Sequence, residues 1–129
     1  MIKLTCSDYK TADMQILIHH VYEYNKGLRS LVLHTMHSSE REKTENLLQR
    51  KGISYFLQTV SQNKINVFFG KQECIQIVKF FGDKSLSDFT DEQDFILGIM
   101  LGYDRNQQYE RYIKRTGINN ELIHEKLVG

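Results

Sequence analysis

With 129 residues, 40% of them hydrophobic and 26% charged, the chain has the size and composition of one globular domain. Its formal net charge of +1 argues against a dedicated binder of nucleic acids or anionic membranes. No apolar run approaches the roughly 20 residues that a membrane-spanning helix needs, and the N-terminus lacks a signal-peptide pattern. We therefore expect a cytoplasmic protein with no membrane partner.

The two cysteines, Cys6 and Cys74, are far apart and fit no metal-ligand spacing. In a cytoplasmic protein this pattern indicates free thiols rather than a disulfide.

The charges are unevenly distributed along the chain. Residues 83–104 hold six acidic residues and one lysine, whereas residues 105–115 hold four basic residues and one glutamate. Neighbouring blocks of opposite sign can pair within the fold or across a symmetric dimer.

The N-terminal third predicts a helix followed by a strand. Residues 1–13 are polar and unpatterned, so we expect a loose extension. Residues 14–26 carry apolar side chains at helical spacing and are followed by Gly27, which favours a helix, although a strand turning near Gly27 is the alternative. Residues 28–35 are rich in branched apolar residues and predict a strand.

The middle of the chain predicts a helix and a hairpin. Ser39 and Glu42 have the spacing of a capping box, which predicts a helix as far as Lys51. Residues 53–60 and 65–69 then predict two strands joined by a short polar loop.

The C-terminal part predicts helices. Residues 71–81 carry an apolar stripe, and residues 91–101 are apolar on nearly every face, which requires cover on more than one side. A further helix is expected over 104–115 and a short last helix over 121–127. The stripe of the first helix consists of Cys74, Ile77, Val78 and Phe81.

Four capping, packing and termination signals accompany these helices. Thr90 with Gln93, and Asp104 with Gln107, have N-terminal capping spacing. Gly98 and Gly102 would let another backbone approach closely, while Gly117 would end a helix.

This order of elements predicts one α+β domain. A crossover and a hairpin place the third strand between the other two, giving a three-stranded antiparallel sheet of order 2-3-1. We expect about five to six helices, packed on one face of the sheet as in half of a ferredoxin-like sandwich. Both outer strands would leave open edges, which are sites for pairing with a second chain.

Three stretches of the sequence resemble an uncharacterised bacterial family, catalogued as domain of unknown function number two thousand twenty-three. They are residues 19–35, 66–70 and 94–104, and the resemblance covers about residues 16–116. It implies three strands, five helices and a homodimer, and family members encoded near flavodoxins imply a redox context. The family has no assigned catalytic residues, so none is carried over.

The candidate ligand-binding residues are His34, His37, Gly70 and Lys71. The two histidines flank the end of the first strand and could bind a ligand or act as bases. The Gly70-Lys71 turn, between a strand and a helix, leaves backbone N–H groups beside a cation, as in an anion site.

Two further chemical readings are weaker. His19 and Glu23 lie one helical turn apart but have no third metal ligand, so we predict no metal. Cys74 lies on an apolar stripe and is expected to be a buried structural thiol.

The candidate interface lies on the two helices around Gly102, where aromatic, apolar and arginine side chains are typical of protein–protein surfaces. The same tyrosines and arginines over 105–115 are the basis of an alternative, binding of single-stranded nucleic acid. The interface residues are Phe95, Ile96, Ile99, Met100, Tyr103, Tyr109, Arg111 and Tyr112.

We therefore expect a non-enzymatic homodimeric interaction or accessory protein without a cofactor, with a redox protein as a further partner. The first alternative is a small enzyme or anion-binding protein that uses His34, His37 and the Gly70-Lys71 turn. The second is a nucleic-acid binder.

Overall fold

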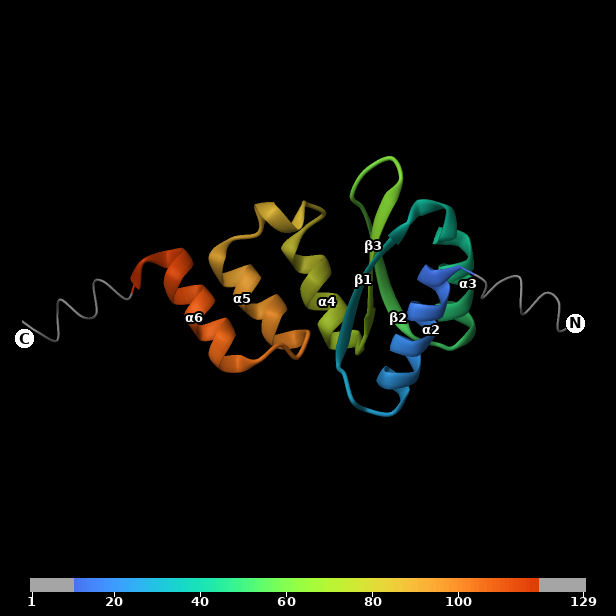
Figure 1. Ribbon diagram of the computed structural model, residues 1–129, viewed down its shortest axis with the longest axis horizontal. Coiled ribbons are helices and arrows are strands. Elements are labelled where there is room, and N and C mark those ends of the chain that lie inside the picture. The colour runs from blue at the N-terminus through green and yellow to red at the C-terminus, as the bar shows by residue number, and fades with distance from the viewer. Residues whose placement is uncertain (1–10, 119–129) are drawn as a thin grey trace, which may run out of the picture. The chain divides into compact units, whose positions relative to one another are not determined.

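The structure, a computed structural model, describes residues 11–118 (Figure 1). The described chain consists of two compact units, residues 11–83 and residues 84–118. The first unit contains the sheet and the second contains a pair of helices. Each unit is described separately.

The first unit confirms the predicted α+β fold class. Its three strands form one antiparallel sheet in which β3 lies between β1 and β2. This is the order that the hairpin and crossover predicted. The elements of the unit are α2 (Ala12–Asn25), β1 (Leu31–His37), α3 (Arg41–Arg50), β2 (Ser54–Thr59), β3 (Lys64–Gly70) and α4 (Gln72–Phe81).

The helical reading of residues 14–26 is confirmed, but α2 begins earlier. The side chain of Thr11 accepts a hydrogen bond from the backbone of Met14 at 3.2 Å and caps the helix. Residues 12 and 13 therefore belong to α2 and not to a loose extension, while residues 1–10 lie outside the described residues. The apolar face of α2 is buried through Met14, Leu17 and Val21.

The predicted capping box at Ser39 and Glu42 is wrong. A 3-10 turn over Ser38–Glu40 precedes α3, and Glu40, which caps α3, makes no side-chain capping bond. His37 caps the turn instead, because its Nδ1 accepts from the backbone N–H of Ser39 at 3.1 Å. The imidazole of His37 therefore has a structural role that the spacing of serine and glutamate did not reveal.

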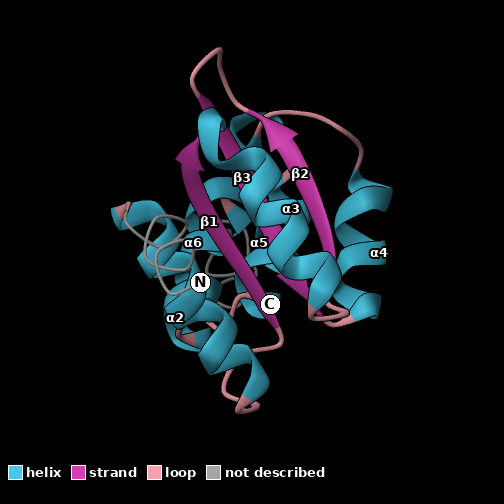
Figure 2. Cartoon of the chain, turned by 90° about the vertical axis from the view of Figure 1, so that its right-hand side faces the viewer, coloured by secondary structure: helices cyan, strands magenta, loops and turns pink. Residues whose placement is uncertain are grey.

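Helices cover both faces of the sheet, which corrects the expectation of cover on one face. Helices α2 and α3 lie on one side of the strands and α4 lies on the other (Figure 1), near β2 (Figure 2). The cause is β3, whose residues from Ile65 to Gly70 are all buried. Successive side chains of a strand point to opposite faces, so a strand buried along its whole length needs cover on both.

The core on the α2 and α3 side combines the alternate residues of the strands with both helices. β1 contributes Val32 and Met36, while β3 contributes Ile65, Val67 and Phe69. β1 itself begins at Leu31, three residues after the predicted start.

The opposite face of the sheet carries a row of hydrogen-bonded polar side chains, one from each strand. The hydroxyl of Thr35 donates to Asn66 Oδ1 at 2.6 Å, and the amide of Asn66 donates to Gln58 Oε1 at 3.0 Å. The three residues are directly opposite one another in the strand register, and Asn66 and Gln58 are buried. This polar row satisfies groups that would otherwise be costly to bury.

The apolar stripe of α4 differs by one residue from the prediction. Cys74, Val78 and Phe81 are buried as expected, but Ile75 is buried and Ile77 is 39% exposed. The stripe therefore runs through positions i, i+1, i+4 and i+7, so α4 is rotated slightly from the predicted orientation.

The second unit is a helical hairpin formed by α5 (Asp91–Met100) and α6 (Arg105–Thr116). The capping box of Thr90 with Gln93 is confirmed, and Asp104 accepts from the backbone of Gln107 at 3.0 Å. Gly117, with φ of 73°, follows α6 in the left-handed conformation. The predicted helix over 121–127 lies outside the described residues.

Candidate functional sites

Two histidines meet between α2 and β1 in the first unit. His34 alternates with Val32 and Met36 along β1, so it faces the core side that α2 covers. Its ring centroid lies 5.6 Å from that of His20 on α2. Nε2 of His34 is buried without a hydrogen-bond partner, and Asp13 Oδ1 lies 3.7 Å away. This distance is too long for a hydrogen bond.

His20 is held by Arg29 from the connection between α2 and β1. The guanidinium nitrogen Nη1 of Arg29 lies 2.9 Å from Nδ1 of His20. Because a guanidinium can only donate, Nδ1 is the acceptor and the ring proton resides on Nε2. Glu23 Oε1, 3.4 Å from the same Nδ1, is then a neighbouring charge rather than a hydrogen-bond acceptor.

Both histidines of this pair favour the neutral form. Burial lowers the pKa of His34, and the adjacent His20 lowers it further. Burial likewise lowers the pKa of His20, against the opposing influence of Glu23. Desolvation disfavours the charged imidazolium, so we expect two neutral rings in contact at neutral pH.

The spacing of His19 and Glu23 does not extend to a metal site. Nε2 of His19 lies 3.6 Å from Glu23 Oε2, and the side chain of His19 is 68% exposed. Among residues 11–118, no group of three or more histidine, cysteine, aspartate or glutamate side chains is arranged to hold a metal ion.

The structure does not bring the four candidate ligand residues together. His37 is paired with Lys64 in the sheet register, whereas Gly70 is paired with Leu31 at the opposite end of β1. His34 and His37 are three residues apart in a strand, so their side chains point to opposite faces. The backbone N–H of His37 also donates to Asp13 Oδ2 at 3.0 Å, which fastens α2 to the edge of β1.

The Gly70-Lys71 turn has a structural explanation. Gly70 has a φ of 149°, and a Cβ at this position would overlap the carbonyl oxygen of Ser30. The backbone N–H of Lys71 donates to that oxygen at 2.9 Å. One of the N–H groups expected to receive an anion is therefore already used.

Cys74 is confirmed as a buried free thiol on α4. Burial raises its pKa, and this outweighs the opposing effect of the nearby Lys71. A raised pKa reduces the thiolate population that nucleophilic or redox chemistry requires.

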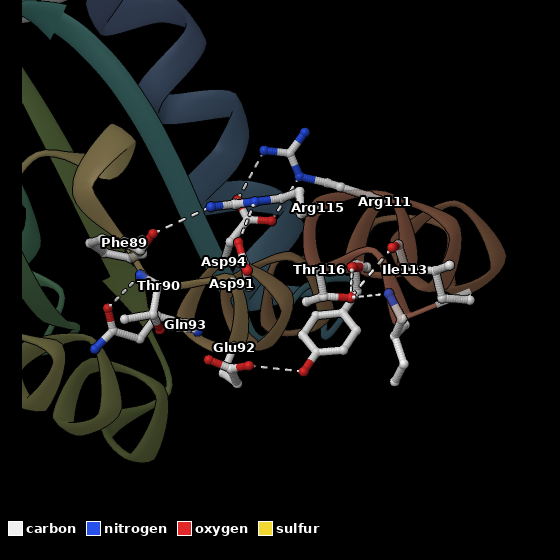
Figure 3. A network of polar contacts seen from close by, with 12 residues as sticks. Phe89, Thr90, Asp91, Glu92, Gln93, Asp94, Arg111, Ile113, Arg115 and Thr116 are labelled. Carbon is white, nitrogen blue, oxygen red and sulfur yellow. Dashed lines mark hydrogen bonds and ion pairs between the residues drawn. The ribbon is translucent and has the colours of Figure 1, made fainter. Parts of the chain in front are cut away.

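In the second unit, the opposite charges of the two sequence blocks pair across the hairpin (Figure 3). Arg111 donates two hydrogen bonds to Asp94, at 2.7 and 3.0 Å. Arg115 contacts Asp94 at 2.8 Å and Asp91 at 2.9 Å. The hydrogen bond from Arg111 is the largest cause of the lowered pKa of Asp94. These arginines are thus bound by carboxylates of the same unit.

Four of the predicted interface residues make contacts within the hairpin itself. Phe95 packs against Tyr109 and Tyr112, with ring centroids 6.1 and 5.2 Å apart. The hydroxyl of Tyr112 donates to Glu92 at 2.9 Å, and Arg111 is bound to Asp94. These contacts hold α5 against α6.

Other predicted interface residues remain accessible. Ile96, Ile99 and Tyr103 are 39%, 37% and 53% exposed, and Met100 is partly buried. Ile96, Ile99 and Met100 have the spacing i, i+3 and i+4, which places them on one face of α5, and Tyr103 follows just after the helix, beyond Gly102. We call Ile96, Ile99, Met100 and Tyr103 the α5 row. Tyr109 on α6 is also exposed, at 46%.

The sequence did not predict that Asp13 and His20 lie beside His34, or that Arg29 contacts His20. The alternation of His34 with buried residues was a usable signal, because it places an imidazole on the core face. The arginine gave no such signal, since its contact with His20 depends on how the chain turns after Gly27, where φ is 80°.

The fold and these sites define a class of protein: a small α+β protein with a partly buried histidine pair and a helical hairpin that carries an apolar row. Residues 15–115 match the family model described as "Protein of unknown function (DUF2023)", and the chain belongs to this family. A search of curated proteins found no match to the chain. None of the helices within residues 11–118 has the length and apolar character needed to span a membrane.

Proposed function

We propose that this protein is a non-enzymatic interaction module that acts as a homodimer in the cytoplasm. The observation that carries the proposal is the α5 row, in which Ile96, Ile99 and Tyr103 form an exposed apolar stripe. Contiguous apolar side chains on an otherwise polar surface are typical of protein interfaces.

The charged groups of the hairpin support this proposal by their pairing. Asp91, Asp94, Arg111 and Arg115 neutralise one another within the unit. The hairpin therefore has fewer unpaired charges to desolvate on association. The same pairing makes the nucleic-acid alternative less favourable, because these arginines would have to exchange aspartates for phosphates.

A second copy is the occupant that suits a helical hairpin. Two hairpins that pack their apolar rows against each other form a four-helix bundle, a common arrangement in which each pair supplies half of the core. A two-fold dimer also uses the same patch on both copies, so a single row is sufficient.

The test is light scattering of the full chain across a dilution series. We expect twice the mass of one chain for the wild type and a shift to the single-chain mass for Ile96→Glu and Ile99→Glu, because a carboxylate would be buried in the interface. Val60→Glu is the matched control, since Val60 is 51% exposed in the loop between β2 and β3. A wild type that has the mass of one chain at every concentration would overturn the proposal.

A redox protein is the second proposed partner, and this part rests on the family resemblance and its flavodoxin context. Calorimetric titration with a purified flavodoxin tests it, and we expect saturable binding by the wild type. Absence of binding removes the redox partner from the proposal without affecting the dimer.

The proposed role is an accessory one rather than a catalytic one, and it includes no cofactor. His34, His37 and the Gly70-Lys71 turn are spread over opposite faces and ends of β1. A reaction that needs them together has no geometric support.

A further inference from the structure

A groove lies beside the N-terminal end of β2 in the first unit. Its volume is about 530 Å³. The strand side is formed by Ile53, Ser54 and Tyr55, and the helix side is formed by α4 through Gln72, Ile75, Gln76 and Lys79. Figure 2 shows α4 beside β2, on the side away from β3. All of the lining residues belong to the sheet-containing unit.

The pairing of β2 with β3 leaves the backbone N–H and C=O groups on the outer side of β2 without a strand partner. The N–H of Val60 donates to the carbonyl of Lys64 at 3.0 Å, which fixes the alternation of the ladder. In an antiparallel pair every second residue turns its N–H and C=O away from its partner. On β2 these residues are Tyr55, Leu57 and Thr59. Among residues 11–118, no backbone hydrogen bond beyond the ladder with β3 uses them.

The other edge of the sheet is capped at its end, at His37. On β1 the outward N–H of His37 is bonded to Asp13, and α2 is fastened there. Side chains that occupy edge N–H groups are a common way to prevent strand addition. β2 has no equivalent contact among the described residues, so the two edges are chemically different.

The α4 wall of the groove is suited to a main chain. Gln72, Gln76 and Lys79 recur at i, i+4 and i+7, so they follow one face of the helix. Glutamine amides both donate to and accept from peptide groups. Lys79 forms no ion pair with any residue from 11 to 118, and its ammonium is available for a carboxylate. Ile53 and Ile75 provide a buried apolar floor.

We propose that this groove binds an extended peptide segment of a partner protein, which adds to β2 as a fourth strand and places an acidic side chain at Lys79. Strand addition of this kind derives affinity from main-chain hydrogen bonds and specificity from alternate side chains. The proposal is independent of the dimer through the α5 row, since none of its residues belongs to the hairpin.

A peptide fits the groove better than the β2 edge of a second copy does. A two-fold pairing of β2 with β2 would bring two α4 helices together, each carrying Gln72, Gln76 and Lys79. Lysine is depleted at such interfaces, and two like charges would face each other. One extended chain meets Lys79 without this repulsion.

The test uses the full chain against a display library of random linear peptides. We expect enriched peptides to alternate in polarity and to contain an acidic residue. Binding of an enriched synthetic peptide should shift the amide resonances of residues 53–59 and 72–79. Methylation of every second peptide nitrogen, on the side that pairs with β2, should abolish binding because the ladder loses its donors.

Charge reversal supplies the matched variant. Lys79 lies at an exposed position of α4. We expect Lys79→Glu to weaken binding of the acidic peptide by about tenfold or more, and an acid-to-lysine change in the peptide to restore that binding. Lys26→Glu, at the end of α2, should leave binding unchanged. An unenriched library, resonance shifts confined to other residues, equal binding of the methylated peptide, or a wild type that dimerises through β2 would overturn the proposal.

Discussion

Gln108 of α6 occupies the space that a side chain at position 98 of α5 would need. A Cβ built on Gly98 overlaps Oε1 of Gln108 and lies within 3.3 Å of its Cγ. Gln108 is only 8% exposed, so its side chain has little room to move. The glycine predicted to admit another backbone thus receives a glutamine from the neighbouring helix of the same unit.

Substitution Gly98→Ala is expected to lower the free energy of unfolding by about 1 kcal/mol. Overpacking costs about 1–3 kcal/mol, and the better helix propensity of alanine recovers about 1 kcal/mol of this. Urea denaturation measures the change. In a double-mutant cycle, Gln108→Ala should remove most of the penalty. A penalty that persists in the Gln108→Ala background would show that the overlap is not its cause.

Substitution Asp94→Asn is expected to destabilise the hairpin by about 1 kcal/mol, because it removes the charge shared by Arg111 and Arg115. The figure is modest since the arginines are partly exposed. Thermal unfolding at low and high salt measures it, and the difference from the wild type should shrink as salt rises. Asp88→Asn, which removes an acid from the same sequence block, is the control. Equal effects of both changes would contradict a specific role for the network.

The stability of the protein is expected to fall as the pH is lowered below about 6.5. The folded-state pKa values of His20 and His34 lie below the ordinary 6.5, so the unfolded chain binds protons first as the pH drops. The stabilisation is complete above 6.5 and is lost as the pH falls through the folded-state values. The slope cannot exceed about 1.4 kcal/mol per pH unit for each histidine.

Urea denaturation at a series of pH values measures this slope, and His34→Gln should reduce it. Asp94 does not interfere, because its pKa lies below the ordinary 3.8 and its contribution is lost only at lower pH. A slope unchanged by His34→Gln would remove the histidine pair as its source.

Cys74 is expected to react with an aromatic disulfide reagent far more slowly in the native protein than in urea. Its thiol is buried and its pKa is raised by that burial. Absorbance of the released thiolate measures the rate of this reaction. The Cys6→Ser background ensures that Cys74 is the cysteine that reacts. A native rate close to that in urea would indicate an accessible, reactive thiol and would favour a redox role for α4.

Sequence patterns predicted the elements of the fold because those signals are local. The i, i+3, i+4 spacing of α2, the hairpin of β2 and β3, and the capping box at Thr90 each depend on residues close in the chain. The prediction that all helices cover one face of the sheet was wrong for α4. The face that α4 covers depends on which face of β3 still needs burial after α2 and α3 have packed.

The candidate sites were less predictable than the fold. The residue type alone does not distinguish the roles of His34 and His37. In the structure His34 lies against His20, whereas His37 caps a turn. What separates them is the two-residue alternation of β1, together with contacts to Asp13, which lies 21 and 24 residues away in sequence. Long-range contacts of this kind have no pattern in a single sequence.

The polar row of Thr35, Asn66 and Gln58 favours one register of the three strands, because its hydrogen bonds form only in that register. A slip of β3 by one residue would bury Asn66 among the aliphatic side chains under α2 and leave Thr35 and Gln58 opposite apolar neighbours. A redesign that replaced all three with branched aliphatic residues could gain stability, as replacement of buried polar sets often does. It would also give up hydrogen bonds that, together with the stacked rings of Phe56 and Phe68 on the same face, distinguish one alignment of these strands from its neighbours.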